Sequence, residues 1–226
     1  MESTRILALR HGETAWNVDT RIQGQLDIGL NDTGRWQAQQ AALALQHEDI
    51  AAVYSSDLSR AFETANTIAQ AVSRQQNKVL RVQPHTGLRE RHFGHFQGKT
   101  WAEIEQHWPE DARLWRQRDP NWTPQAGESL VQLRERIAHC VDQLASQHAG
   151  EHIVLVAHGG VLDVLYRLAT GQSTQAPRTW HLGNAALNRL LWTPQGLSLV
   201  GWGDVSHFEV THDARVESRP RDESSA

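Results

Sequence analysis

Basic and nucleophilic side chains follow three short apolar runs of this sequence, close to where each run ends. The runs are Arg5–Leu9, Ile50–Ser55 and His152–Ala157, and they lead to Arg10 and His11, to Arg60, and to His158. Uninterrupted apolar runs of this length are typical of strands that are covered on both faces. Ligands of open parallel sheets bind at the carboxyl ends of the strands. The sequence therefore predicts that two arginines and two histidines share one site.

A phosphate group is the ligand that these side chains favour. Arginine forks match phosphate oxygens in bidentate geometry, and helix N-termini present free N–H groups to anions. Gly159 and Gly160 follow His158 where a helix is expected to begin, and Gly12 follows His11. We expect these glycines to let the backbone approach the phosphate oxygens closely.

His11 has the chemistry of a nucleophile in such a site. An imidazole nitrogen attacks phosphorus if the other ring nitrogen carries the proton, so we expect His11 to have an acceptor, most simply a backbone carbonyl. A phosphoryl transition state spreads negative charge over three oxygens, which two guanidiniums and a second imidazole can stabilise without a cation. The alternative is a histidine that only caps the strand end. Its basic neighbours favour the nucleophile.

Five motifs, in order, resemble the signatures of the histidine phosphatase superfamily, also called the phosphoglycerate mutase-like family. They are Arg-His-Gly-Glu-Thr at Arg10–Thr14, followed by Arg21–Asp27, Tyr54–Ala65, Leu88–Gly98 and Val156–Gly160. The likeness spans the chain from Arg5 to about His207. It implies an α/β fold, a three-layer α/β/α sandwich with a mostly parallel central sheet.

The resemblance also implies roles for individual residues. It makes His11 the residue that becomes phosphorylated and Glu90 the proton donor. The phosphoryl oxygens would be held by Arg10, Arg60 and His158, with further phosphate or substrate contacts from Asn17, Gln23 and Gly159. The family uses no metal, and we expect no cofactor.

Glu90 fits the acid role chemically, because a departing alkoxide needs a proton and the same carboxylate can later take one from water. An alternative is that Arg89 or Arg91 simply pairs with it. His92 and His95 have a spacing that could bind metal, but without a third ligand nearby we interpret them as solvated loop histidines.

Helical patterns alternate with the apolar runs and predict one domain over residues 1–210. Helices are expected at Arg35–Gln46, at Leu58–Val72, and within Ser129–Gln147, where Ser129 and Gln132 have capping-box spacing. Ala185–Trp192 and Leu197–Trp202 are typical of a hairpin at a sheet edge. The polar residues 211–226 are expected to form a disordered tail, with a flap over the site as the alternative.

Four tryptophans recur every seven residues: Trp101, Trp108, Trp115 and Trp122. Pro109 interrupts this pattern, so a continuous coiled-coil face is not expected. We interpret the tryptophans as packing a helical excursion, about residues 99–126, onto the sheet. In the alternative, one or two of them line the pocket for the leaving group.

Composition excludes several classes of protein. The formal net charge of -4 and the lack of a basic block argue against nucleic-acid binding. Cys140, the single cysteine, allows no internal disulfide, fits a reducing cytoplasm and is expected to fill the core. No stretch has the length of a membrane span or the pattern of a secretory signal. An exposed hairpin edge could pair with that of a second subunit to form a homodimer.

Three functions are compatible with these motifs. The first is a metal-independent phosphomonoesterase that hydrolyses a small phosphorylated metabolite. The second is a cofactor-dependent phosphoglycerate mutase, and the third is a phosphate-binding module without activity. The segments NVDTRIQGQLD and PQAGESL resemble the phosphatase branch, and KTWAEIEQHW lacks the basic pair that mutases carry after the glutamate loop. These features favour hydrolysis, and the leaving group is left open.

Overall fold

A six-stranded sheet, in the order β3-β2-β4-β1-β5-β6, lies at the centre of the computed structural model, which describes residues 2–209. The strands are β1 (Thr4–Arg10), β2 (Ala52–Ser55), β3 (Val82–Pro84), β4 (His152–Ala157), β5 (Leu187–Thr193) and β6 (Gly196–Asp204). The four strands from β3 to β1 are parallel, whereas β5 runs antiparallel to β1 and β6 antiparallel to β5. The three apolar runs of the sequence are β1, β2 and β4, as predicted.

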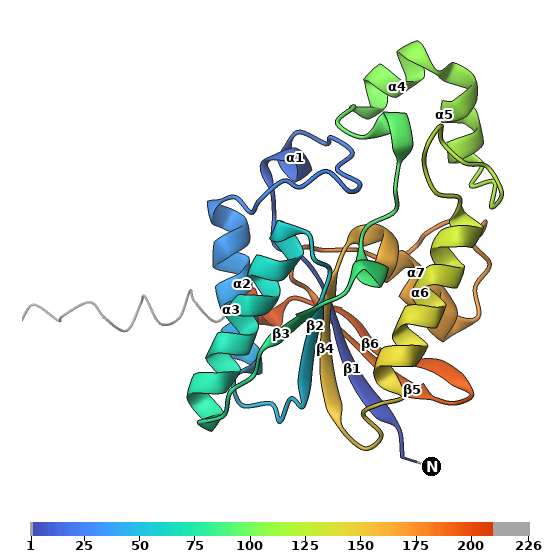
Figure 1. Ribbon diagram of the computed structural model, residues 1–226. Helices are drawn as coiled ribbons and strands as arrows, with labels where there is room; N and C mark the ends of the chain where they lie inside the picture. Colours follow the sequence, from blue (N-terminus) through green and yellow to red (C-terminus); the bar gives the residue numbers. More distant parts are fainter. Residues whose placement is uncertain (1, 210–226) are drawn as a thin grey trace, which may run out of the picture.

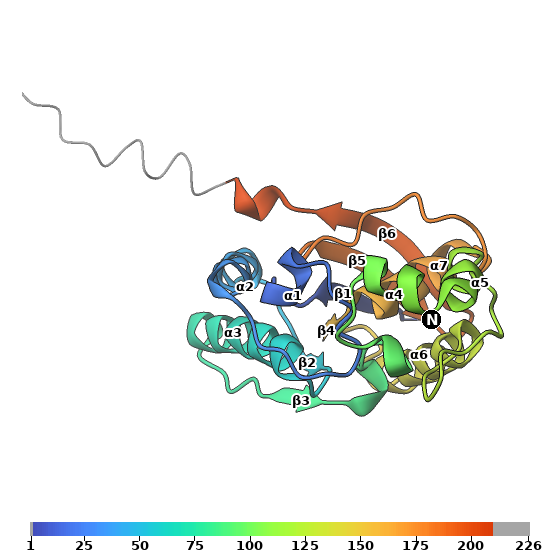
Figure 2. The same cartoon turned by 90° about the horizontal axis from the view of Figure 1, so that it is seen from above.

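Helices cover both faces of this sheet, which confirms the three-layer α/β/α sandwich (Figures 1 and 2). On one face α2 (Asp32–Leu45) and α3 (Ser59–Gln76) pack against alternate side chains of β1 and β4, including Leu7 and Val154. On the other face α6 (Leu130–Ala145) and α7 (Gly159–Thr170) cover Ile6 and Leu155. Successive side chains of a strand point to opposite faces, so both layers draw on the same strands.

The helix ends follow local capping chemistry. Ser129 and Gln132 form the predicted capping box at the start of α6. Helix α2 begins earlier than predicted because the Asn31 side chain accepts a hydrogen bond from the Gly34 amide. Helix α3 extends past Val72 to Gln76 through a polar turn that carries no apolar signal, and its C-cap residue Asn77 has the left-handed conformation, with φ of 49°.

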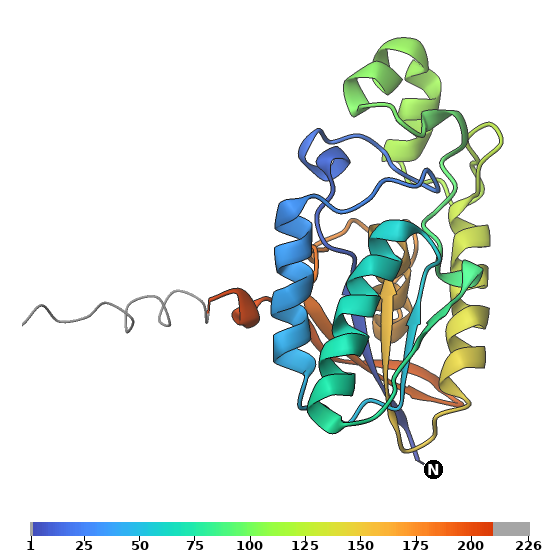
Figure 3. The ribbon, with the colours of Figure 1, turned by 60° about the vertical axis from the view of Figure 1, so that its left-hand side comes forward.

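The tryptophan-rich segment forms α4 (Trp101–His107) and α5 (Pro109–Arg116), which stand beyond the carboxyl ends of the strands (Figures 1 and 3). Pro109 occupies the first turn of α5, a position that needs no backbone N–H. The tryptophans pack with one another around Phe96, Ile104 and Ala112 in a cluster of their own. The prediction that they pack onto the sheet is therefore wrong, because the excursion has its own small core.

Short elements complete the described chain: α1 (Ala15–Val18), η1 (Thr86–Leu88), η2 (Gly94–Phe96) and η3 (Ser206–Phe208). The predicted hairpin is present as β5 and β6, and β6 lies at the edge of the sheet. Within residues 2–209, no helix is both long enough and apolar enough to cross a membrane. The predicted tail, residues 211–226, lies outside the described residues.

Candidate active site

His11 and His158 are neighbours because β1 and β4 are paired in parallel register. Arg10 lies opposite Ala157, and the His11 amide donates a hydrogen bond to the Ala157 carbonyl at 2.9 Å. Both histidines are buried, and their ring centroids are 5.2 Å apart. The strand ends thus bring together two imidazoles that are far apart in the sequence.

The tautomer of His11 follows from its backbone contact. Nδ1 lies 2.7 Å from the carbonyl oxygen of Gly12, and a carbonyl can only accept, so Nδ1 carries the proton. Nε2 is left with its lone pair. Burial, and then the charges of Arg10 and Arg60, hold the pKa of His11 well below its usual value. His11 is therefore neutral at neutral pH, with the acceptor that the sequence predicted.

The backbone around His11 is fixed from three sides. The Gly12 amide donates to Thr64 Oγ1 at 3.1 Å, and Asn184 Nδ2 donates to the His11 carbonyl at 2.8 Å. A Cβ at Gly12 would lie 2.3 Å from the carbonyl oxygen of Gly34. Glycine is thus required here by close approach of the Gly34 backbone, which the sequence reasoning did not foresee.

Arg10 and Arg60 reach the site with part of each guanidinium already anchored. Arg10 Nη1 donates to the Leu182 carbonyl at 2.8 Å, and Arg60 donates to the carbonyls of Leu26 and Gly24 at 2.8 and 2.7 Å. The Nε atom of each arginine is buried without a hydrogen-bond partner among residues 2–209. Burial lowers the pKa of both groups, that of Arg60 to about 10. A guanidinium is too basic to lose its proton in a protein, so both carry positive charge.

His158 is fully buried at the N-terminus of α7, and neither of its ring nitrogens has a hydrogen-bond partner within the described chain. Burial, followed by the charge of Arg60, holds the pKa of His158 well below its usual value. Leaving buried polar nitrogens unpaired costs free energy, about 1–3 kcal/mol each. The protonated ring nitrogen of His158 and the Nε–H groups of Arg10 and Arg60 are therefore buried donors that an anion would satisfy.

Glu90 lies beside this set and is held by backbone amides. Its carboxylate accepts hydrogen bonds from the amides of Arg91 and Gly160 at 2.7 and 3.0 Å. Arg89 pairs with Asp57 instead. The guanidinium of Arg91 donates to the Glu128 carbonyl. The alternative in which a neighbouring arginine pairs with Glu90 is therefore wrong.

A cavity of about 170 Å³ opens beside these groups, and neither His158 nor Gly159 is among the residues that line it. The predicted site residues that line it are Arg10, His11, Asn17, Gln23, Arg60 and Glu90. Gln23 is buried, with its amide oxygen unpaired among the described residues. Two larger hollows of about 490 Å³ lie along α6, but neither is lined by an arginine. The chemistry of its lining, rather than its size, makes this cavity the candidate site.

The other predicted residues have distinct places. Gly159 begins α7, and a Cβ there would lie 3.8 Å from the Arg10 guanidinium. Asn17 also caps α1 locally, since its Oδ1 accepts a hydrogen bond from the Thr14 amide at 3.0 Å. The tryptophans do not line the cavity, which touches Phe93 from the same region instead.

Sequence reasoning missed several lining residues. Arg21, Ile22 and Gly24 lie within the motif at 21–27, so the motif itself carried a signal for them. Asn184 does not line the cavity but holds the His11 carbonyl, and no signal pointed to it because it comes from the irregular connection between α7 and β5.

The histidine pair near Glu90 does not form a metal site. Residues 2–209 contain no group of three side chains able to hold a metal ion. His95 is also not a solvated loop residue as predicted, because it packs against Phe96 and Trp108 with ring centroids 4.2 and 4.8 Å away. Cys140 is buried, as predicted, and burial raises the pKa of its thiol to about 11.

Comparison with known proteins gives one consistent result. The chain matches the histidine phosphatase superfamily (branch 1) over residues 6–205. It is 39% identical to a metal-independent phosphoserine phosphatase of Arabidopsis thaliana, covering 92% of this chain and 84% of that protein. It is also 39% identical to phosphoglycerate mutase-like protein 4 of the same plant, covering 93% and 90%. A mycobacterial glucosyl-3-phosphoglycerate phosphatase solved with VO3 superimposes with a TM-score of 0.74, at 35% identity and with 88% and 99% coverage.

Proposed function

The chain belongs to the histidine phosphatase superfamily (branch 1), and on that premise we propose that it hydrolyses a small phosphorylated metabolite through a phosphohistidine at His11. It is a phosphoric monoester hydrolase, like the phosphatases that it resembles. One observation carries the assignment to these residues. Unpaired, buried nitrogens of Arg10, Arg60 and His158 are gathered beside a neutral His11 whose Nε2 is free.

In the first step, the lone pair of His11 Nε2 attacks phosphorus and the bond from phosphorus to the leaving oxygen breaks. Nδ1–H stays hydrogen-bonded to Gly12 and stabilises the positive charge that develops on the ring. Arg10 and Arg60 hold the equatorial oxygens with Nε, where negative charge accumulates. Glu90, in its protonated form, gives its proton to the leaving oxygen.

In the second step, the Glu90 carboxylate accepts a proton from water as that water attacks the phosphohistidine. The bond from phosphorus to Nε2 breaks, inorganic phosphate forms, and His11 returns to its neutral state. The Arg91 and Gly160 amides donate hydrogen bonds to this carboxylate and hold it in place for the step.

Hydrolysis is supported over phosphoryl transfer by the arginines of the excursion. A mutase needs fixed cations that anchor a substrate carboxylate and a bridging phosphate. Arg113 pairs with Glu110, Arg116 with Glu105, and Arg118 with Asp163. The cavity is not lined by any of these three.

The volume of the cavity supports a small leaving group, and Ile22 and Phe93 give it an apolar wall. Arg21 lines the same wall, although its Nη1 already donates to the Gly98 carbonyl and to Glu103. A small metabolite ester whose leaving group is partly apolar fits these features best.

The experiment supplies 3-phosphoglycerate in the presence of EDTA, with and without 2,3-bisphosphoglycerate, and measures inorganic phosphate beside 2-phosphoglycerate. We expect phosphate release to dominate. Rapid isomerisation with little phosphate would make the chain a mutase. If no phosphorylated metabolite in a broader panel released phosphate, a binding module would be the better assignment.

We also propose that the enzyme is cytoplasmic and forms a homodimer. A cytoplasmic location is supported by the single buried thiol, Cys140. A homodimer through the β6 edge is supported by its position at the end of the sheet and by exposed Val200. Light scattering of wild type and Val200→Lys tests the dimer, since a β6 interface would be weakened by the added charge.

A further inference from the structure

Glu90 lies in an irregular stretch, residues 89–93, between the short turns η1 and η2. Neither a helix nor a strand ladder supplies hydrogen bonds to this backbone, yet a general acid must be held within hydrogen-bond reach of the leaving oxygen. Something outside the stretch must therefore fix it.

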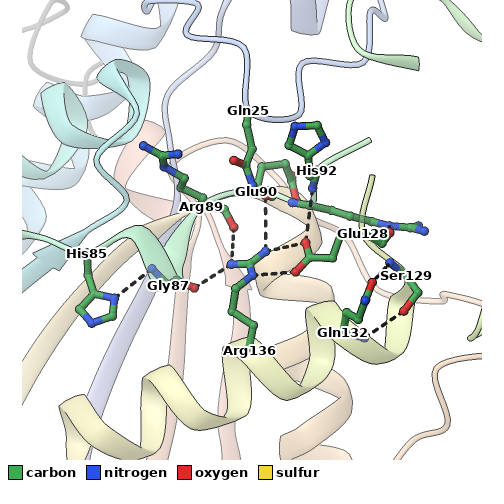
Figure 4. Close-up of polar contacts among 11 residues, drawn as sticks. Gln25, His85, Gly87, Arg89, Glu90, His92, Glu128, Ser129, Gln132 and Arg136 are labelled. Carbon is green, nitrogen blue, oxygen red and sulfur yellow. Dashed lines mark hydrogen bonds and ion pairs between the residues drawn. The ribbon is translucent and has the colours of Figure 1, made fainter. Parts of the chain in front are cut away.

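The Arg136 guanidinium supplies that support from α6 (Figure 4). Its Nη1 donates to the carbonyls of Gly87 and Arg89 at 2.8 and 2.9 Å, and its Nη2 makes a longer contact of 3.5 Å with the carbonyl of Glu90. A planar fork with five donors can hold several carbonyls at once, which an ammonium group cannot copy.

Glu128 binds the same guanidinium and also contacts the backbone of His92, on the C-terminal side of Glu90. Arg136 donates from Nε and Nη2 to its two carboxylate oxygens at 2.7 and 2.8 Å. The Glu128 carboxylate also accepts from the His92 amide at 3.3 Å, and the Glu128 amide donates to the His92 carbonyl at 2.8 Å. Figure 4 shows the ion pair between the two flanks of Glu90.

Helix α6 holds both members of this ion pair in place. Glu128 directly precedes the capping box of Ser129 and Gln132, which fixes the first turn of α6. The neighbouring residue of Arg136, Ile137, is fully buried in the core against the sheet. The side chains of Arg136 and Glu128 are only 25% and 14% exposed, so solvent screens their interaction less than that of a surface pair.

We propose that Arg136, held by Glu128, is a positioning residue that fixes Glu90 as the general acid and base. Arg136 does not line the cavity, so it acts through the backbone of residues 87–90 rather than on the substrate. The proposal rests on the proposed function, because it assigns a purpose only if Glu90 transfers protons.

The test compares two substrates that differ in their need for an acid. An alkyl phosphate needs a proton on its leaving oxygen, whereas p-nitrophenolate leaves without one. Arg136→Lys keeps the charge and removes the fork, and Arg136→Gln removes both. We expect each to lower kcat/KM on the alkyl phosphate about 10- to 100-fold, and kcat/KM on p-nitrophenyl phosphate by less than about threefold, because kcat/KM reports the formation of the phosphohistidine and not its hydrolysis.

Arg134→Gln is the matched control, since Arg134 lies on the same helix and its Nη1 has no hydrogen-bond partner among residues 2–209. It should leave the ratio of the two rates unchanged. Thermal melts identify any variant that has lost its fold, and Arg136→Lys is the variant expected to keep it.

A double variant completes the test. Arg136→Gln added to Glu90→Gln should cause no further loss on the alkyl phosphate, because the two changes remove the same proton transfer. Equal losses on both substrates, or a further loss in the double variant, would overturn the positioning role while leaving the acid role of Glu90 intact. If Glu90→Gln itself lowered kcat/KM equally on both substrates, the acid role would fail, and the positioning role with it.

Discussion

His11 and His158 lie side by side at the ends of two paired strands, with their ring centroids 5.2 Å apart and their planes tilted by 59°. Both are buried, and both have a pKa held well below the usual value, by burial first and then by Arg10 for His11 and by Arg60 for His158. The positive charge of the pocket therefore comes from two guanidiniums beside two neutral imidazoles.

Acidification should destabilise the protein through these histidines. An unfolded histidine takes up a proton below about pH 6.5, whereas folded His158 resists protonation. Because the unfolded state then binds more protons, the free energy of unfolding decreases as the pH is lowered. The contribution of His158 is about 1 kcal/mol between pH 7 and pH 5.5. Urea unfolding of wild type and His158→Asn should show a shallower pH dependence in the variant. The same slope in both would contradict the neutral, buried state, and His47→Asn at an exposed turn serves as the control.

Replacement of Arg60 even by lysine should lower activity strongly. Arg60→Lys keeps a charge but cannot hold both the Gly24 and Leu26 carbonyls and still present Nε to the phosphate. We expect kcat/KM to fall about 10²- to 10³-fold, with Arg60→Ala little worse. Steady-state kinetics against Arg74→Lys, an exposed arginine on the same helix, check this. Recovery of most activity in Arg60→Lys would mean that charge alone is enough.

Gly160→Ala should impair catalysis more than stability. A Cβ at this position would lie 2.2 Å from Glu90 Oε1, and the tip of a flexible side chain moves aside more easily than backbone. We expect hydrolysis of an alkyl phosphate to fall about tenfold or more, with a near-normal thermal melt. Gly29→Ala, where the added Cβ meets no atom within 4 Å, is the control. Full activity of Gly160→Ala would show that the position of Glu90 does not matter.

Chelation should leave turnover intact, because Arg10 and Arg60 supply the charge that a divalent cation would otherwise bring. Phosphate release is measured before and after dialysis against EDTA, and again after magnesium or zinc is added. Loss of activity on dialysis, restored by one of the ions, would contradict the mechanism.

The sequence predicted those parts of the site that follow strand ends. Arg10, His11 and His158 could be located because apolar runs fix the strands and parallel pairing brings their carboxyl ends together. The supports of Glu90 could not, since Arg136 acts on carbonyls that are about 50 residues distant in the chain and a charged helix residue looks like any solvated one. The prediction that the repeated tryptophans pack onto the sheet was wrong for a similar reason. Its seven-residue spacing indicates burial but not the partner, and here the partners are the tryptophans themselves.

Trapping the phosphoenzyme tests the mechanism most directly. The protein is mixed with substrate, quenched without acid within milliseconds, digested at alkaline pH and analysed by mass spectrometry, because phosphohistidine is lost in acid. We predict one phosphoryl group on His11 in wild type, more of it in Glu90→Gln with p-nitrophenyl phosphate because hydrolysis of the intermediate is slowed, and none in His11→Ala. A phosphoryl group on His158, or near-normal turnover by His11→Ala, would contradict the central claim.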